Sequence, residues 1–420
     1  MVELNKGQAK AFKRAISGEN LFITGVGGTG KSFLLKTLVN ELKQRYTKGK
    51  VQVTALTGLA AIGIDGKTLH SFAGMGHDLS REPESNLFVM RRWKNTKVLI
   101  IDEVSMLTRE FFEKVYRLAK KFKIQLILFG DFLQLPPVNI NGEEKNLPCF
   151  TSPKWKEAGL RGKGTIILNE VIRQKDKDFI KVLNEIRMGD ISRESKDYLI
   201  ELSKKGKPSE DKLTKIYPIN RSVNSENLAK LKMIPSEEII LTSKDKTNTS
   251  RPHKALLQML NKEAPQEIVI KVGARVMLTR NRTGSILVNG SIGEVVGISA
   301  TKDPFVTFEC MPNAPILIER IDYEVKMGKD KLTRSQYPLK LAWSNTAHKI
   351  QGMTLHKILA SVSDSFEKGQ IYTILSRVTT PEGLYIDDVD VILEKNKVCE
   401  LAKKYYKEHQ LCNIFNKIKT

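Results

Sequence analysis

Short apolar runs alternate with longer amphipathic stretches through the first 140 residues of the chain. The stretch after the first run predicts a helix over residues 32–46, where apolar positions recur at helical spacing. The apolar runs are short enough to be buried strands, and they lie at residues 21–24, 51–56, 97–101 and 124–129. Strands that are apolar on both faces need helices on both sides, so the pattern predicts a doubly wound α/β domain with a parallel sheet over residues 1–164.

The alternation breaks at residues 74–96, which form a polar stretch containing glycine and proline. This stretch ends in the basic and aromatic cluster Arg91-Arg92-Trp93-Lys94. We interpret it as a small insertion at the rim of the sheet, and a plain surface loop with a helix is the alternative.

A second α/β pattern is predicted at residues 165–238 and again at 338–420, with a β-rich segment at 239–337 between the two parts. Within that segment, residues 271–278 and 292–296 flank an Asn289-Gly290 pair, which is a strong hairpin signal. We therefore expect a small all-β insert. The last residues place Val398, Leu401, Tyr405, Cys412 and Phe415 on one helical face, which we expect to dock on the core rather than on a membrane.

The charge balance points to a polyanionic partner. The 69 Lys and Arg residues exceed the 47 Asp and Glu residues and give a formal net charge of +22. Nucleic acid is the first candidate and an anionic membrane surface is the second, while a merely solvated basic surface is the alternative. The four cysteines and six histidines show no metal-ligand spacing. We find no signal peptide or membrane-spanning run, so we expect a soluble, intracellular protein with no membrane partner.

Residues 25–32 match the phosphate-binding pattern G-x-x-x-x-G-K-[ST] in full, between a predicted strand and a predicted helix. The glycines let backbone N–H groups face phosphate oxygens, and the helix N-terminus adds a positive dipole end. Lys31 would reach the outer phosphates of ATP, and Ser32 would hold Mg²⁺. A glycine-rich surface loop is the alternative. The nucleotide-binding residues of this block are Gly25, Gly28, Thr29, Gly30, Lys31 and Ser32.

Candidate catalytic groups follow two later strands. Asp102 ends one strand and suits a Mg²⁺ ligand, and Glu103 beside it can accept a proton from an attacking water. Gln134, in the block 130–138, is an uncharged amide that could sense the terminal phosphate. An acidic pair alone is often a solvated turn, but the complete phosphate-binding loop before it favours catalysis.

These blocks, with Gln8 upstream, resemble the motif series of superfamily-one helicases, and most of all the Pif family on the branch of the RecD-type enzymes. The resemblance continues through residues 168–174 with Phe179, Leu183, Ile186-Arg187 and Gly189, then 338–343 and 348–355, and finally 366–372 and 375–377. It covers residues 4–386, and an ordered series is more specific than any single block.

The resemblance implies an α/β fold of two RecA-like lobes with parallel sheets and with ATP and Mg²⁺ between them. The segment 74–96 would be a short wedge in the first lobe, and 239–337 would be a small SH3-like β-barrel inserted in the second. Gln8 would contact adenine, Gln351 and Gly352 would contact the nucleotide, and Arg173 and Arg377 would be arginine fingers. A guanidinium is permanently charged and can neutralise charge that builds on the terminal phosphate.

DNA would cross both lobes in this family. The positions that match its DNA-binding motifs are Thr57, Thr68, His70, Ser71, Phe72, Pro137, Asn220, Arg221, His348 and Lys349. Hydroxyl and amide groups suit phosphates, and the Phe72 ring would stack on a base, unless it is a core residue. The chain departs from the family between residues 112 and 124, where a Pro-Phe-Gly-Gly-like turn is missing and Lys120 replaces an arginine.

The function predicted is an ATP-dependent DNA helicase that moves five-prime to three-prime on single-stranded DNA, unwinds duplex or structured DNA in replication, repair or recombination, and works as a monomer. The direction comes from the resemblance alone. One alternative is a translocase that displaces bound proteins without processive unwinding. A nucleotide-dependent binding switch is another, although the two predicted arginine fingers argue against it.

Overall fold

The structure is a computed structural model that describes residues 3–75, 79, 83–137, 146–206, 208, 213–218, 223–248, 254–280, 282, 287, 289–327 and 330–408. The chain divides into two compact units. The first consists of Met1–Lys205 with Ala360–Thr420, and the second of Gly206–Leu359.

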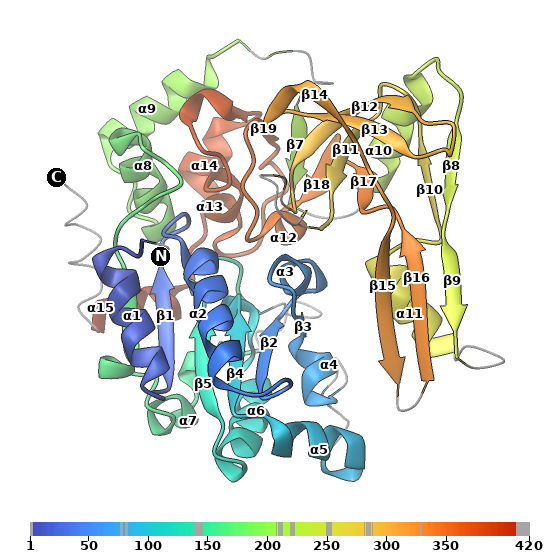
Figure 1. Ribbon diagram of the computed structural model, residues 1–420. Helices are drawn as coiled ribbons and strands as arrows, with labels where there is room; N and C mark the ends of the chain where they lie inside the picture. Colours follow the sequence, from blue (N-terminus) through green and yellow to red (C-terminus); the bar gives the residue numbers. More distant parts are fainter. Residues whose placement is uncertain are drawn as a thin grey trace. The chain divides into compact units, whose positions relative to one another are not determined.

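The first unit is built on a six-stranded sheet in the order β3-β2-β4-β5-β1-β6 (Figure 1). Every neighbouring pair in this sheet is parallel. The strands are β1 (Leu21–Gly25), β2 (Val51–Ala55), β3 (Lys67–Thr68), β4 (Val98–Asp102), β5 (Gln125–Phe129) and β6 (Thr165–Leu168). The predicted parallel α/β domain is therefore confirmed.

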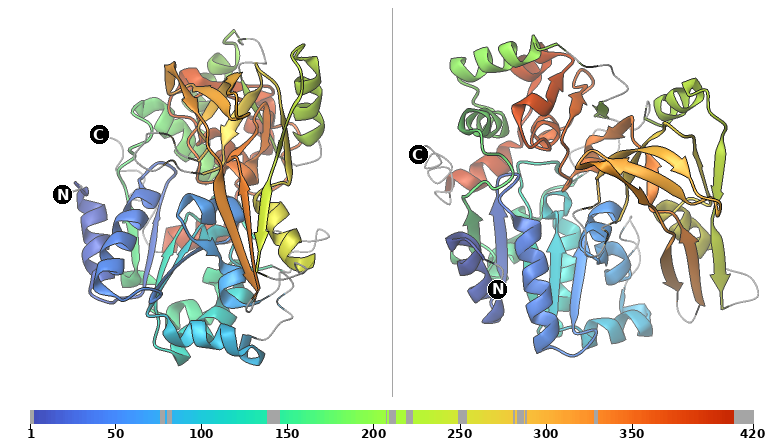
Figure 2. Two further views of the ribbon diagram at one scale, coloured as in Figure 1. Left: turned by 45° about the vertical axis from the view of Figure 1, so that its right-hand side comes forward. Right: turned by 45° about the horizontal axis from the view of Figure 1, so that its top comes forward.

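Helices lie on both faces of this sheet (Figures 1 and 2). Apolar side chains form a core on each face. On one face, Leu21 and Ile23 of β1 pack with α1 (Lys6–Ile16) and α2 (Lys31–Arg45). On the other face, Phe22 packs with residues of α6 (Arg109–Lys121), α7 (Pro153–Glu157) and α15 (Glu400–Glu408). Because successive side chains of a strand point to opposite faces, this alternation places β1 between the two layers of helices.

The remaining elements of the first unit lie around this layered core. They are α3 (Gly58–Gly63), α4 (Leu69–Ala73), η1 (Pro83–Ser85), α5 (Leu87–Asn95), η2 (Val104–Met106), η4 (Cys149–Thr151), η5 (Gly162–Gly164), α8 (Lys177–Met188), α9 (Arg193–Ser203), α13 (Gln370–Leu375), η7 (Pro381–Gly383), β20 (Leu384–Ile386) and α14 (Val389–Lys395). β19 (Ile358–Ala360) neighbours β20, and the chain returns to the first unit within it. Asp176 caps the N-terminus of α8, where its side chain accepts from the N–H of Phe179, and Gly189 ends the helix with a left-handed conformation.

We expected the strand that begins at residue 165 to open a second α/β unit, and this assignment of the strand is wrong. β6 pairs with β1 in the first sheet, with Ile166 opposite Ile23 and Leu168 opposite Gly25. Thr165 and the three apolar residues after it specify a strand but not the sheet that it joins, and this strand pairs with the open edge of β1.

The C-terminal helix docks on the core, as predicted, and Tyr405 of the predicted face is buried there, but Leu401 is not. α15 buries Ala402, Tyr405 and Tyr406, whereas Leu401 is 47% exposed. Cys412 and Phe415, which the prediction placed on the same face, lie outside the described residues.

The second unit combines a short parallel pair with antiparallel sheets. β7 (Thr214–Tyr217) pairs with β18 (Ser344–Thr346). The antiparallel strands are β8 (Ile239–Thr242), β9 (Lys244–Thr247), β10 (Glu267–Ile270), β11 (Arg275–Leu278), β12 (Ile292–Ile298), β13 (Pro304–Phe308), β14 (Met311–Leu317), β15 (Ile321–Met327), β16 (Asp330–Gln336) and β17 (Leu339–Leu341). The helices are α10 (Val223–Met233), α11 (Lys254–Glu263) and α12 (Ala347–Ile350).

The hairpin predicted at Asn289-Gly290 is present. β11 and β12 are antiparallel, and the Gly290 N–H donates to the Leu278 carbonyl at 2.9 Å. The expectation of an all-β insert is wrong, because α11 lies inside it with Leu256 and Leu260 buried one helical turn apart. β17 also pairs with β11, so the sheet extends beyond residue 337.

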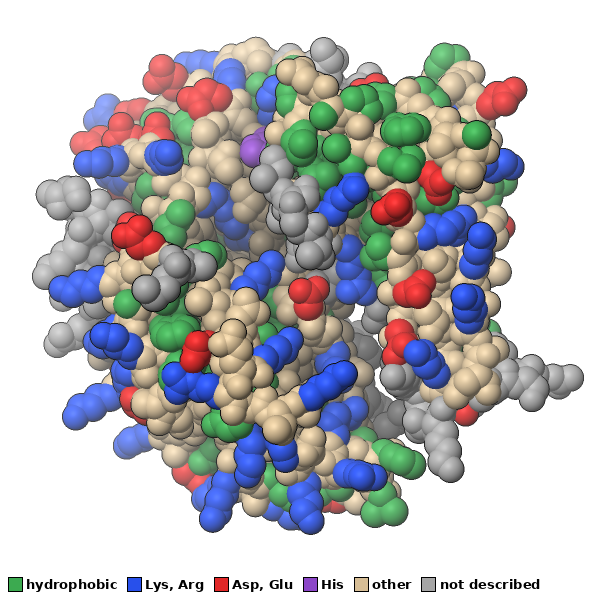
Figure 3. All heavy atoms as spheres, viewed as in Figure 1, with side chains coloured by type: hydrophobic (Ala, Val, Ile, Leu, Met, Phe, Trp, Pro, Cys, Tyr) green, Lys and Arg blue, Asp and Glu red, His purple; other side chains and the backbone are tan. Residues whose placement is uncertain are grey.

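Basic side chains predominate over α1 and α2 on the face shown in Figure 3. α1 carries Lys6, Lys10, Lys13 and Arg14 and has no acidic residue. Within the part of the chain that the structure describes, none of the helices has both the length and the apolar character to cross a bilayer.

Candidate nucleotide-binding site

The loop between β1 and α2 has the backbone that a phosphate-binding loop requires. Gly28 and Gly30 have positive φ angles of 87° and 77°, which side chains disfavour. Neighbouring groups also exclude a side chain, because a Cβ would lie 2.7 Å from the Arg173 Cβ at Gly28 and 2.6 Å from the Gln8 Nε2 at Gly30. The loop thus brings backbone N–H groups and the N-terminus of the 15-residue helix α2 to one point.

Lys31, the first residue of α2, folds over this loop. Its Nζ donates to the carbonyls of Gly25 at 2.7 Å and Val26 at 3.0 Å. Burial lowers the pKa of Lys31 to about 8, although the charges of Asp131 and Glu103 act to raise it. A buried ammonium with a lowered pKa is stabilised by an anion, as a polyphosphate would be.

Two carboxylates follow β4 in the same unit. Asp102 is the last residue of the strand and is 6% exposed, and Glu103 has a left-handed conformation with a φ of 54°. The Glu103 N–H donates to Asp102 Oδ1 at 2.9 Å. Burial first, and the charge of Glu103 second, raise the pKa of Asp102 to about 7. A bound cation would relieve this cost, because it favours the ionised carboxylate.

Asp102 and Ser32 fit a magnesium site of the nucleotide type. Ser32 is exposed in the first turn of α2, and both residues offer the oxygen ligands that Mg²⁺ takes. Across the described ranges no cluster of three or more His, Cys, Asp or Glu residues forms a metal cage. Mg²⁺ bound with a nucleotide needs no such cage, since one or two protein oxygens, phosphates and water complete its shell.

Arg173 contacts the phosphate-binding loop, and Arg377 lies close enough to Arg173 for their charges to interact. The Gly28 carbonyl accepts from the backbone N–H groups of Ile172 at 2.8 Å and Arg173 at 3.1 Å. Arg377 is 2% exposed, and burial lowers its pKa. Burial also lowers the pKa of Arg173, to about 9, with a further contribution from the charge of Arg377. The two guanidinium groups and Lys31 therefore concentrate positive charge at one place.

Two predicted glutamines flank this positive cluster. The Gln8 side chain is 1% exposed and donates through Nε2 to the Thr29 carbonyl at 3.4 Å. It also completes a capping box with Asn5 at the start of α1. Gln134 is 3% exposed, and its Oε1 accepts no hydrogen bond from any described group. Such a buried acceptor suits a position that gains a partner when a ligand binds.

The structure shows a buried ion pair whose role the sequence did not suggest. Arg187 Nε donates to Asp131 Oδ2 at 2.8 Å, and Arg187 Nη2 donates to Asp131 Oδ1 at 2.7 Å. Burial acts to raise the pKa of Asp131, but the charge and hydrogen bonds of Arg187, the charge of Lys31 and the Leu133 N–H together outweigh it, so this pKa is lowered. The hydroxyl of Tyr406 lies 3.2 Å from Asp131 Oδ1 and 2.7 Å from Thr24 Oγ1, next to the phosphate-binding loop.

Comparison with known proteins agrees with this geometry. The sequence profile of the family described as PIF1-like helicase matches residues 3–197. The ATP-dependent DNA helicase PIF1 of Danio rerio is 37% identical over 97% of this chain and 65% of that protein. The Pif1 helicase structure from Candida albicans superposes with a TM-score of 0.78 and 33% identity, over 97% of this chain and 100% of that chain. The chain belongs to the Pif1 family.

A Pif1 structure from Bacteroides superposes with a TM-score of 0.80 and 26% identity over 99% of both chains. The α/β fold with its parallel sheet is thus the RecA-like fold of the Pif1 helicases. The chain spans 65%, 58% and 66% of the lengths of the Danio rerio, Emericella nidulans and Xenopus laevis relatives.

Some of the DNA-contact positions that the Pif1 resemblance implied in the first unit are exposed, and others are buried or packed against neighbouring side chains. Thr57 and Thr68 cap α3 and α4, where their hydroxyls accept from backbone N–H groups. Ser71 is exposed, whereas the His70 ring lies 4.4 Å from the Phe111 ring. Pro137 is buried.

The expectation that Phe72 stacks on a base is wrong for this structure. Its ring is fully buried and packs 4.8 Å from the Trp93 ring, between centroids. Arg92 lies over the same ring at 5.5 Å and donates to the Ser71 carbonyl at 2.9 Å. Phe72 therefore anchors α4 to α5 in the core.

The remaining predicted positions lie in the second unit or outside the described residues. Gln351 is buried and Gly352 exposed just after α12, and His348 and Lys349 are half-buried on that helix. The Lys349 N–H donates to Thr346 Oγ1, which caps α12. Asn220 and Arg221 are outside the described residues.

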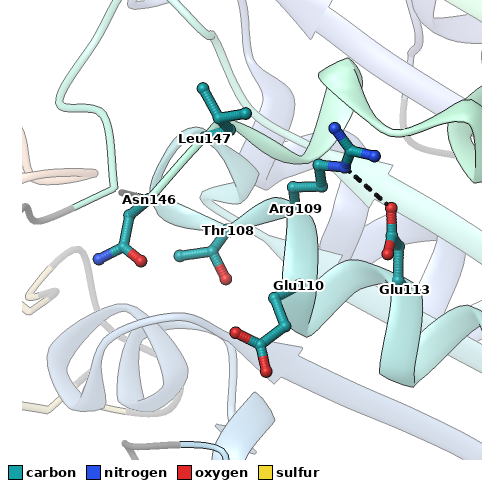
Figure 4. A pocket seen from close by; sticks show the side chains of 6 residues that line it. All are labelled: Thr108, Arg109, Glu110, Glu113, Asn146 and Leu147. Carbon is teal, nitrogen blue, oxygen red and sulfur yellow. Dashed lines mark hydrogen bonds and ion pairs between the residues drawn. The ribbon is translucent and has the colours of Figure 1, made fainter. Parts of the chain in front are cut away.

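The segment that departs from the Pif1 pattern forms the continuous helix α6. Arg117 pairs with Glu84 at 3.1 Å, and Lys120 pairs with Glu157 at 2.6 Å. At the start of this helix a hollow of about 140 Å³ is lined by Thr108, Arg109, Glu110, Glu113, Asn146 and Leu147 (Figure 4). Arg109 Nε and Glu113 Oε1 in its lining form an ion pair at 3.0 Å, so these two charges compensate each other.

The raised pKa of Asp102 predicts a pH-dependent gain of stability in Asp102→Asn. A raised pKa means that the folded state binds the proton more tightly, so the cost of ionisation is absent below pH 4 and complete above about pH 7. The free energy of unfolding of the variant should exceed that of wild type at pH 8, and this difference should be larger than at pH 5 by on the order of 2 kcal/mol. Urea unfolding without Mg²⁺ measures both values. The variant should also lose ATP hydrolysis.

The matched control is Asp197→Asn on the exposed face of α9, which should show no gain that grows with pH. A variant less stable than wild type at pH 8 would show that Asp102 is stabilised as an ion, against the electrostatics described above.

Proposed function

We propose that this protein is an ATP-dependent DNA helicase that translocates five-prime to three-prime on single-stranded DNA. The observation that carries the proposal is the gathering of Lys31, the Asp102-Glu103 pair and two arginines around one phosphate-binding loop. The Danio rerio relative is named an ATP-dependent DNA helicase, and Bacteroides Pif1 structures include complexes with ADP-AlF4 and with single-stranded DNA.

In the proposed reaction each side chain has a separate role. The Lys31 ammonium binds the outer phosphates, and the loop N–H groups hold the inner phosphates. Mg²⁺, held by Ser32 and Asp102, would neutralise charge on the phosphate oxygens. Glu103 accepts the proton of the attacking water, and Gln134 gains a hydrogen bond to the terminal phosphate or to that water. Gln8 contacts the adenine edge.

Arg173 and Arg377 are the proposed arginine fingers. Arg377→Ala should lower kcat for ATP hydrolysis by about 10³-fold, because positive charge near the terminal phosphate is lost where negative charge develops. The ATP dissociation constant should change by less than about threefold, since the lysine and loop contacts remain. Stopped-flow binding and steady-state hydrolysis measure the two effects separately.

The control for this variant is Arg45→Ala, which removes an exposed arginine paired with Glu41 on α2 and should change neither constant. If Arg377→Ala weakened ATP binding and left kcat unchanged, the finger role would be wrong.

The finer architecture is also a proposal. We place the second RecA-like lobe at residues 165–238 and 338–420, except that its first strand, β6, pairs within the first sheet. We place an SH3-like insertion at residues 239–337. The segment 74–96, which includes α5 with the exposed Leu87 and Phe88, would be the wedge. Thr57, Thr68, His70, Ser71, Asn220, Arg221, His348 and Lys349 would contact the DNA, and Gln351 and Gly352 the nucleotide. The surplus of +22 charge supports a nucleic-acid partner.

Unwinding of forked DNA tests this function. A fork with a five-prime single-stranded tail should be separated when ATP and Mg²⁺ are present, and a fork with only a three-prime tail should not. Displacement of a bound protein without strand separation would favour the translocase alternative. One Pif1 structure contains two coordinating helicases at a forked duplex, so sedimentation of the DNA complex should accompany the assay to test the monomeric motor.

A further inference from the structure

One N–H group of the phosphate-binding loop already has a hydrogen-bond partner in the protein. The Gly27 N–H donates to the hydroxyl oxygen of Tyr372 at 2.8 Å. Tyr372 lies on α13 and is 2% exposed, and burial raises its pKa, so the hydroxyl is neutral. Gly27 is the third residue of the block 25–32, between residues whose backbone lines the proposed phosphate site.

The contact between this loop and α13 is tight. A Cβ built on Gly27 would lie 3.3 Å from the Tyr372 hydroxyl and 3.3 Å from Ser376 Oγ. A backbone N–H has one hydrogen, and a linear hydrogen bond uses it for one acceptor. A phosphate oxygen at Gly27 would therefore replace the Tyr372 oxygen.

The same short helix holds both proposed fingers. Arg173 Nη1 donates to the Ser376 carbonyl at 2.8 Å, and Arg377 Nη2 donates to Ser376 Oγ at 2.8 Å. Gln174 Nε2 also donates to the Ser376 carbonyl, at 3.2 Å. Any shift of α13 relative to the loop would therefore move Arg377, which follows the helix, and would change the surroundings of Arg173.

The other end of α13 rests on the segment that contains Gln134. Gly369, which precedes α13, has a positive φ of 72°. A Cβ there would lie 2.5 Å from the Leu133 carbonyl oxygen and 2.7 Å from that of Gln134. α13 therefore contacts the phosphate-binding loop, the finger arginines and the candidate sensor glutamine together.

We propose that the Tyr372 hydroxyl competes with a nucleotide phosphate for the Gly27 N–H, so that ATP binding breaks the hydrogen bond between α13 and the phosphate-binding loop. Tyr372 is then a positioning residue that relates nucleotide occupancy to the placement of Arg173 and Arg377. The inference rests on the proposed ATP site and adds a competing group that the catalytic roles do not require.

Tyr372→Phe tests the competition, because it removes the hydroxyl and keeps the ring. The variant should bind N-methylanthraniloyl-ATP about threefold to tenfold more tightly than wild type, since the hydrogen bond stabilises only the form without a phosphate at Gly27. A merely structural role predicts the opposite, because a disturbed loop binds more weakly. The matched control is Tyr405→Phe, which removes another buried hydroxyl, bonded to Trp155 Nε1 at 3.2 Å, and should leave ATP affinity unchanged.

A milder replacement keeps the test valid if Tyr372→Phe does not fold. 3-Fluorotyrosine at position 372 retains the hydroxyl but makes it a weaker acceptor, so the ATP analogue should bind more tightly by a smaller factor. If the wild-type protein binds ATP and the foldable variants bind it equally or more weakly, the competition is wrong. If the wild-type protein binds no ATP, the proposed function itself fails.

Discussion

Lys31→Ala should lower the rate of ATP hydrolysis by about 10²- to 10³-fold, while affinity for single-stranded DNA stays within about twofold. The ammonium lies over the phosphate-binding loop and supplies a charge-assisted hydrogen bond that strengthens as the terminal phosphate gains negative charge. Alanine leaves the loop backbone and α2 in place. Hydrolysis is measured by phosphate release, and DNA affinity by fluorescence anisotropy at constant salt.

The control is Lys36→Ala, which removes an exposed lysine from the same helix and should leave hydrolysis unchanged. Normal turnover in Lys31→Ala would show that the loop at residues 25–32 is not the site of hydrolysis.

Arg187→Ala should lower the free energy of unfolding of the first unit by about 3–5 kcal/mol, because it leaves Asp131 buried and uncompensated. The two bonds of 2.8 Å and 2.7 Å would be lost together, along with the packing of the guanidinium 5.1 Å from the Tyr406 ring centroid. Urea unfolding followed by tryptophan fluorescence measures the change, since Trp93 and Trp155 are buried in this unit.

Lys181→Ala provides a control on the same helix, α8, because Lys181 pairs with Glu194 at the surface. Its urea midpoint should hardly change. The double variant Asp131→Leu with Arg187→Met should recover much of the lost stability, since an apolar pair leaves no buried charge. An unfolding free energy in Arg187→Ala equal to that of wild type would mean that the pair contributes nothing.

The loop at residues 25–32 was predictable because all the residues that form it are consecutive in the sequence. The eight residues 25–32 determine the loop, and a strand before them and a helix after them determine its direction. The positions of Asp102 at the end of β4 and of Gln134 after β5 were predictable, because each apolar strand is followed by polar residues. The placement of Arg173 and Arg377 rested on the ordered family motifs; the Arg173 backbone contacts the loop and Arg377 lies near Arg173, while their roles as fingers stay predictions.

Contacts between residues that are far apart in the sequence were not predictable, because no single segment of the sequence contains both partners. Asp131 and Arg187 are separated by 56 positions and Tyr406 from Asp131 by 275, so their meeting depends on the packing of α8 and α15. Phe72 was assigned to DNA because it matches the position of a DNA-binding motif of the family, but its ring packs against the Trp93 ring of α5 in the core. β6 was assigned to the wrong sheet because an apolar run carries no information about its pairing partner.

The rate of ATP hydrolysis with and without single-stranded DNA tests the central claim most directly. We predict slow hydrolysis by the protein with Mg²⁺ alone and a rise of at least about tenfold when single-stranded DNA is added, because the proposed fingers act fully only when the DNA-bound motor closes on ATP. Hydrolysis that is absent under both conditions, or equal under both, would contradict an ATP-driven DNA motor.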